Sequence, residues 1–155
     1  MPKSANDKTF KIEDAELIFR NFSGKPGKYN VEGERNFSVL LPEDVAQQML
    51  ADDWNVKWLD PREEGDESRA YISVNVKFGY RPPRIVLITG PTRQNITEDT
   101  VGVLDWANIE TADLICRGFF WEVGGKSGWK PYLQSLFVTI EEDDLERKYA
   151  INVTE

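Results

Sequence analysis

Apolar and polar residues alternate along much of the chain, and this alternation predicts β-strands. In the segment YISVNVKF, Ile72, Val74 and Val76 fall on one side of the predicted strand, and Tyr71 and Lys77 fall on the other. Side chains in a strand point alternately to its two faces, so the first set is expected in the core. The second set includes a large ring on the polar side, which core burial does not explain.

The same kind of pattern predicts the other strands and one helix. Residues 8–22 are expected to form a bent strand or a strand pair with a bulge near Asp14–Glu16. Pro42, followed by two acidic residues, starts the one clear helix, whose apolar positions include Val45 and Met49. We expect further strands at 35–41, 54–59 and 84–89, a loop at 90–95, a helical turn within 97–108, and a long hairpin of 112–123 and 129–140 around the glycine-rich loop 124–128.

Six to eight strands with a single internal helix indicate a mostly β domain. The expected fold is an OB-fold-like small β-barrel with extra strands and one inserted helix, and a jelly roll or β-sandwich is the alternative. Residues 1–7 are expected to be a flexible N-terminal tail, 8–140 the folded domain, and 141–155 a charged C-terminal helix or tail.

Composition removes several classes of function. The 155 residues contain no histidine and a single cysteine, Cys116, so nucleophile systems that need histidine, zinc sites and an internal disulfide are all excluded. One cysteine also favours a reducing cytoplasm. The apolar runs, such as Ile85–Ile88, are far shorter than the roughly 20 residues that a membrane span needs. We therefore expect no enzyme activity, no cofactor, no metal and no membrane contact, and we interpret the Asp/Glu clusters as solvated loops.

The formal net charge is −8, but the charges occur in blocks. Residues 71–95 contain four basic residues and no acidic one, whereas 96–116 contain five acidic residues and no basic one. Exposed charges are screened beyond about 8 Å at physiological salt, so local potential decides whether a polyanion binds. An acidic protein of this kind can still present a basic surface.

Many of the 18 aromatic residues lie next to a basic one. Proteins that bind single-stranded nucleic acid combine cations along the phosphates with flat rings that stack on bases. The acidic residues Asp53, Asp105 and Glu122 lie beside tryptophans and would repel phosphate. We therefore interpret four tryptophans as mainly structural: Trp54, Trp58, Trp106 and Trp121. The residues expected to contact nucleic acid are in the first long loop, on and after the 71–78 strand, and near the last hairpin tip: Lys25, Lys28, Tyr29, Tyr71, Lys77, Tyr80, Arg81, Arg84, Lys126, Trp129, Lys130 and Tyr132.

Several long phrases of the sequence resemble a known family. They are KTFKIEDAELIFRNFSG, DDWNVKWLDPRE, VKFGYRPPRIVLIT, DTVGVLDWANIE and YLQSLFVTIEEDDLERKYA. Together they are similar to phage and prophage single-stranded-DNA-binding proteins of the OB-fold type, from about Lys8 to Ala150. The resemblance implies an accessory of phage DNA replication or recombination that coats exposed DNA without sequence preference. No contact residue is carried over from the family.

The sequence thus favours a non-enzymatic binder of single-stranded DNA in the cytoplasm of a bacterial host. Its expected partners are single-stranded DNA, replication or recombination proteins, and further copies of the chain. One alternative is a structural or assembly module of a phage particle, in which the aromatic residues form core and protein interface. The other is a metal-dependent nuclease that uses Asp and Glu, for which the sequence contains no motif.

Overall fold

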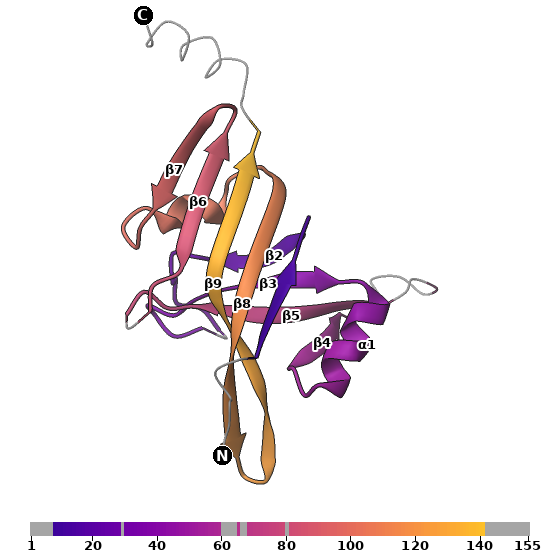
Figure 1. The fold of residues 1–155 in the computed structure, drawn as a ribbon. Helices are drawn as coiled ribbons and strands as arrows, with labels where there is room; N and C mark the ends of the chain where they lie inside the picture. Colours follow the sequence, from indigo (N-terminus) through magenta and orange to yellow (C-terminus); the bar gives the residue numbers. More distant parts are fainter. Residues whose placement is uncertain (1–7, 29, 60–64, 66–67, 80, 142–155) are drawn as a thin grey trace, which may run out of the picture.

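The computed structural model describes residues 8–28, 30–59, 65, 68–79 and 81–141 of the chain (Figure 1). The expected tail at 1–7 and all but the first residue of the one at 141–155 lie outside the described residues, as do Tyr29 and Tyr80. The elements, in chain order, are β1 (Thr9–Ile12), β2 (Leu17–Asn21), β3 (Arg35–Leu41), α1 (Glu43–Ala51), β4 (Val56–Leu59), β5 (Arg69–Val76), β6 (Arg84–Thr89), β7 (Thr92–Ile96), the 3-10 helix η2 (Val101–Asp105), β8 (Ile109–Val123) and β9 (Lys126–Ile140).

The strands form one mixed sheet that bends around a single core. Its main order is β1-β8-β9-β5-β3-β2, with β4 beside β5 and the β6–β7 pair beside β9. Figure 1 shows β2, β3 and β5 running across the long β8 and β9 strands, with α1 and β4 at one side. The prediction of a mostly β, OB-fold-like domain with extra strands and one inserted helix is confirmed.

The first predicted strand region contains two strands with different partners. β1 pairs with β8 and β2 pairs with β3, and the turn between them includes Asp14 at a φ of 53°. The bulge predicted near Asp14–Glu16 is therefore a turn. The irregularity lies instead inside β2, between Ile18 and Asn21, where Phe19 has a φ of 50°.

The last hairpin is longer and its turn is tighter than the sequence suggested. Gly124 and Gly125, both at positive φ, make the two-residue turn, and β8 and β9 each contain 15 residues. Two consecutive positive φ angles are typical of the turns that match strand twist, and glycine adopts them without steric cost. Each strand spans about 50 Å at about 3.4 Å per residue, and the hairpin end extends beyond the body in Figure 1.

One further difference has a simple physical cause. The predicted loop at 90–95 contains most of β7, whose residues Thr92–Asn95 are exposed on an edge strand and therefore show no apolar alternation. The helical turn expected within 97–108 is η2. No helix within the described ranges is both long enough and apolar enough to cross a membrane.

Helix α1 begins where the sequence predicts. Pro42 precedes it, Glu43 and Asp44 lie in its first turn, and Ala46 and Met49 are buried. Acidic residues at this end interact favourably with the helix dipole. Glu43 also accepts hydrogen bonds from the Trp58 indole at 3.0 Å and from Gln47 at 2.7 Å, which lower its pKa below the usual value.

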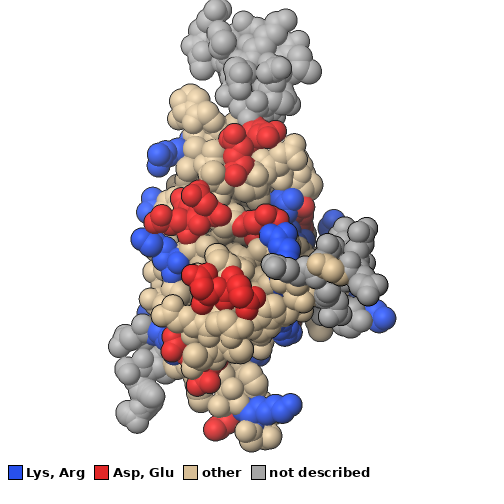
Figure 2. Space-filling view, turned by 90° about the vertical axis from the view of Figure 1, so that its right-hand side faces the viewer, with Lys and Arg blue, Asp and Glu red and all other residues tan. Residues whose placement is uncertain are grey.

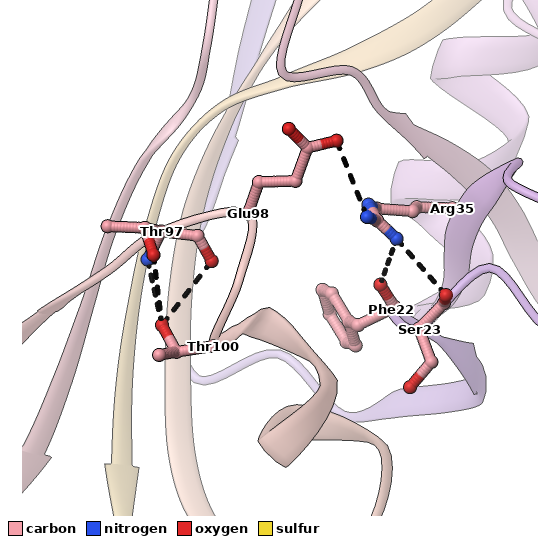
Figure 3. Close-up of polar contacts among 6 residues, drawn as sticks. All are labelled: Phe22, Ser23, Arg35, Thr97, Glu98 and Thr100. Atoms are coloured by element: carbon pink, nitrogen blue, oxygen red, sulfur yellow. Dashed lines mark hydrogen bonds and ion pairs between the residues drawn. The ribbon is translucent and has the colours of Figure 1, made fainter.

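A polar cluster fixes the long loop between β2 and β3 (Figure 3). Arg35 donates from Nη1 to the carbonyl oxygens of Phe22 and Ser23, at 3.3 and 3.1 Å. Its Nη2 lies 3.4 Å from Oε2 of Glu98, in the segment after β7. The carboxylate of Asp105, in η2, accepts hydrogen bonds from the backbone N–H groups of Phe22 and Ser23. The start of this loop is therefore held by Arg35, at the start of β3, and by Asp105, in η2.

Candidate nucleic-acid interface

The two sides of β5 are divided as the alternation predicts. Ile72, Val74 and Val76 are buried in the core, whereas Tyr71, Ser73 and Asn75 are half-buried on the outer side of the sheet. Lys77 is exposed and directly follows the end of β5. β5 therefore presents a ring and two small polar side chains on a surface that the core does not cover.

Tyr71 lies among residues from two other strands. The ring of Phe19, on β2, meets the Tyr71 ring edge to face with centroids 5.8 Å apart. Phe19 is 60% exposed at a positive φ, a conformation that is costly for a bulky residue and that recurs at functional sites. Lys57 of β4 is the cross-strand partner of Tyr71 on the same side. Two rings and a cation thus occupy this end of the outer surface.

The other end of the β5 surface joins the long hairpin. Asn75 is in register with Tyr132 of β9, and Tyr132 is in register with Arg117 of β8. Arg117 is partly buried near Arg81. Desolvation is the larger cause that lowers the pKa of Arg117, and repulsion from the positive charge of Arg81 lowers it further. An anion such as phosphate bound near both guanidinium groups would offset this repulsion.

The row of aromatic and basic residues continues onto the hairpin. Phe119 lies with its ring centroid 5.6 Å from that of Tyr132, and its cross-strand partner is Lys130. The Lys130 ammonium is 5.8 Å from the Trp121 ring centroid, a cation–π contact. Strand alternation places all four side chains on the same side of the hairpin.

We call this set of outer side chains the front row. It crosses five strands, and within the described residues none of its cations forms an ion pair with a carboxylate. Its rings are Phe19, Tyr71, Tyr132, Phe119 and Trp121, and its cations are Lys57, Arg81, Arg117 and Lys130.

Acidic side chains gather elsewhere. Figure 2 shows Asp and Glu concentrated along the middle of one side of the molecule, with Lys and Arg mostly at its margins. A groove of about 690 Å³ is lined by Asp14, Glu16, Glu110 and Glu141, together with Arg20. Arg20 uses its Nη1 to donate to the carbonyl oxygens of Leu104 and Ala107. This groove is unfavourable for a polyanion, and none of the front-row cations lines it.

Asparagines connect the loop between β2 and β3 to the outer side of β5. Asn36 donates to Asn30 at 2.9 Å and is the cross-strand partner of Asn75. Lys25, which the sequence placed in the binding site, is exposed, and Asn21 and Asn30 both hydrogen-bond its backbone. Lys28 is exposed in the same loop.

The other residues predicted to contact nucleic acid do not all lie in the front row. Arg84, on β6, has its guanidinium carbon 5.6 Å from the ring centroid of Phe137. Lys126 lies near the hairpin tip, where Val123 is its cross-strand partner. Trp129 is on the opposite side of the hairpin from Lys130, because β9 stays extended there. It contacts Trp54 with ring centroids 6.3 Å apart.

Sequence reasoning missed several members of the front row. Arg117, Phe119 and Trp121 follow the period of two that marks one face of a strand, and this spacing could have identified them. Trp121 was interpreted as structural because Glu122 follows it, yet consecutive residues of a strand point to opposite faces. Lys57 and Phe19 become neighbours of Tyr71 only through strand pairing.

The four tryptophans interpreted as structural differ from one another. Trp54 is 4% exposed and Trp58 is hydrogen-bonded to the start of α1, which fits that interpretation. Trp106, in contrast, is 74% exposed, so core packing does not account for it. Trp121 is half-buried in the front row.

Comparison with known proteins gives the family. Residues 3–154 match the model of the family described as "Putative phage ssDNA-binding domain". The chain belongs to this family. The family expected from the resemblance is thereby confirmed over nearly the whole sequence. No curated protein matches the sequence.

Solved structures show the same fold at low sequence identity. The chain is similar to the single-stranded DNA-binding protein from bacteriophage Enc34 in complex with ssDNA, with a TM-score of 0.57 and 12% identity, over 92% of this chain and 95% of that one. A C-terminal truncation of the Enc34 protein gives a TM-score of 0.56 and 11% identity, over the same shares of the two chains. These likenesses concern the fold.

Proposed function

We propose that this protein binds single-stranded DNA without sequence preference along the front row, and that it does so during phage DNA replication or recombination. The observation that supports this most directly is the front row itself, in which exposed or half-buried rings lie among cations across five strands. Membership of a phage ssDNA-binding family points to the same ligand. The protein acts as a binder rather than an enzyme, in the cytoplasm of the bacterial host.

The binding mechanism has two parts. Arg117, Arg81, Lys57 and Lys130 neutralise phosphates and release condensed counterions, so affinity falls as salt rises. The rings stack on unpaired bases, each stack contributing about 1–3 kcal/mol by alanine substitution. Every base has a flat face, so neither part requires a particular sequence. The remaining residues predicted from the sequence are proposed to extend this surface. They are Lys25 and Lys28 in the first loop, Lys77, Arg84 and Lys126, and Tyr29 and Tyr80, which lie outside the described residues.

The distribution of charge favours a single strand over a duplex. A flexible strand can follow the front row while avoiding the groove lined by Asp14, Glu16, Glu110 and Glu141. A rigid duplex cannot bend around that acidic side without a cost in deformation energy. The unpaired bases needed for stacking are also absent from a duplex.

A titration with oligo-dT tests the function. Binding should quench tryptophan fluorescence, because Trp121 is in the front row, and the same length of duplex should bind much more weakly. The logarithm of the binding constant should fall linearly with the logarithm of salt concentration, with a slope of about −0.7 per phosphate contact. A phage assembly module would show no binding to oligo-dT at low salt, and that result would reject the proposal.

A further inference from the structure

The long hairpin has aromatic side chains on both of its sides. Opposite the front row, the Phe120 and Trp129 rings meet with centroids 5.2 Å apart, and Trp129 contacts Trp54. Phe10 of β1 packs edge to face on Trp54 at 4.9 Å. The Lys8 ammonium lies 5.2 Å from the Trp129 ring centroid and 6.0 Å from that of Trp54. We call these five residues the back cluster.

Core packing accounts for one end of the back cluster only. Trp54 is 4% exposed, and Phe10 packs against the core. Gly118 leaves the room for this packing, since a Cβ there would lie 2.9 Å from both Trp54 and Trp129. Phe120, by contrast, is 44% exposed at the outer end of the same cluster. A structural role therefore does not explain why a ring stands there.

Lys8 gives the open end of the cluster a positive charge. Its ammonium faces two indole rings, and in the described part of the chain no carboxylate pairs with it. A cation beside an exposed ring is the pair of groups that one nucleotide needs, the first for its phosphate and the second for its base. Glu122 is on the same side nearer the tip, so phosphate is favoured on the Lys8 side of Phe120.

The front row and the back cluster meet at one edge of the sheet. Phe119 and Phe120 are consecutive on β8, so their rings point to opposite sides. β1 pairs with β8 only as far as Arg117, and no strand of the described part pairs with the outer edge of β8 beyond that point. Among the described residues, a DNA strand that stacks on Phe119 can therefore pass over this edge to Phe120 without meeting another β-strand.

We propose that the back cluster is a second base-stacking site, and that single-stranded DNA wraps around the free edge of β8 from Phe119 to Phe120. The proposal rests on the function proposed above, because the front row must hold the first part of the strand. It adds that the DNA contacts both sides of the hairpin, with Phe120 and Trp129 as the stacking surface and Lys8 at the phosphate. Trp129 then binds DNA as the sequence suggested, but on the opposite side from Lys130.

The test compares two lengths of oligo-dT on the full chain. Single OB folds bind about 4–16 nucleotides, so an oligomer of about 5 fits the front row and one of about 16 reaches both sides. Phe120→Ala should weaken binding of the longer oligomer by roughly 5- to 150-fold, as expected for one lost stack, and leave the shorter one unchanged. Phe119→Ala should weaken both. Trp106→Ala, which removes an exposed ring elsewhere, is the matched control and should change neither.

A second variant keeps the test valid if Phe120→Ala unfolds. Lys8→Gln should reduce the salt slope for the longer oligomer by about 0.7 and leave the slope for the shorter one unchanged. Lys11→Gln makes the same charge change at a residue already paired with Glu13 at 3.3 Å, and serves as its control.

The outcomes separate the two proposals. Unchanged binding of the longer oligomer by folded Phe120→Ala, or by Lys8→Gln, with weakened binding by Phe119→Ala, would overturn the second site and leave the front row intact. Failure of the unaltered protein to bind either oligomer would overturn the proposed function itself. A loss in Phe120→Ala and Lys8→Gln that is equal at both lengths would also contradict the wrapping path.

Discussion

Asn75 of β5 lies in register with Tyr132 of β9, and this parallel pair joins the two halves of the front row. The side-chain amide of Asn75 donates to the carbonyl oxygen of Pro131 at 3.5 Å, next to Tyr132. On one side of this junction are Tyr71 and Phe19, and on the other are the residues of the hairpin. The candidate DNA surface is continuous because two segments 57 residues apart in sequence meet at this point.

Tyr71→Ala should weaken binding of oligo-dT by about 1–3 kcal/mol, because a stacking surface is lost. The loss should persist at high salt, since stacking releases no counterion. Phe19→Ala should produce a similar loss, and the double variant should lose less than the sum, because the two rings touch. Affinity measurements at two salt concentrations check this, and strict additivity of the two losses would contradict a shared stacking surface.

Arg117→Gln should reduce the salt dependence of binding. Each lost phosphate contact changes the slope of log K against log salt by about 0.7 for a single strand. Arg93→Gln provides the control, because Arg93 is exposed on β7 and belongs to neither stacking surface. An unchanged slope in Arg117→Gln, with normal folding, would remove Arg117 from the set of phosphate ligands.

Gly118→Ala should destabilise the protein. The added Cβ would lie 2.9 Å from Trp54 and Trp129 and 3.2 Å from the carbonyl oxygen of Lys8. Overpacking of this kind costs about 1–3 kcal/mol. Gly27→Ala is the matched control, because a Cβ there meets nothing within 4 Å. Urea denaturation measures both free energies of unfolding, and equal stabilities would show that the two indoles can move aside.

Arg35→Ala should reduce the free energy of unfolding by about 1–3 kcal/mol, because the carbonyl oxygens of Phe22 and Ser23 lose their donor. Glu98→Gln removes only the partner of the 3.4 Å ion pair, whose carboxylate is exposed. Its effect should lie within about 1 kcal/mol. Thermal denaturation distinguishes the two, and a larger loss in Glu98→Gln would show that the ion pair, not the carbonyl contacts, holds the loop.

The contacts of Glu43 predict a small dependence of stability on pH. Hydrogen bonds from Trp58 and Gln47 lower the pKa of Glu43 in the folded protein below its usual value of 4.5. A lowered folded pKa stabilises the fold above the unfolded pKa, and the effect is lost as pH falls through the folded pKa. The difference in Tm between the natural protein and Glu43→Gln should therefore shrink below about pH 4. A difference that stays constant from pH 7 to pH 3 would contradict this.

The sequence by itself determined the features that depend on near neighbours in the chain. The period of two between Tyr71 and Val76 assigned both sides of β5. The glycine-rich segment 124–128 located the hairpin turn, although only Gly124 and Gly125 form it. Because adjacent residues of an extended strand point to opposite sides, the sequence order of Trp129 and Lys130 also assigns them to opposite sides of β9. These results follow because strand geometry and glycine conformation are local properties.

Only the tertiary structure decided which side chains meet on the outer surface. Periodicity specifies where a side chain points relative to its own strand, but not which distant strand lies beside it or in what register. Phe19 reaches Tyr71 through an irregularity in β2, Lys57 through the β4 pairing, and Tyr132 through the single register pair with Asn75. Strand order and register depend on how the whole sheet packs around its core, and a local sequence pattern contains no record of that packing.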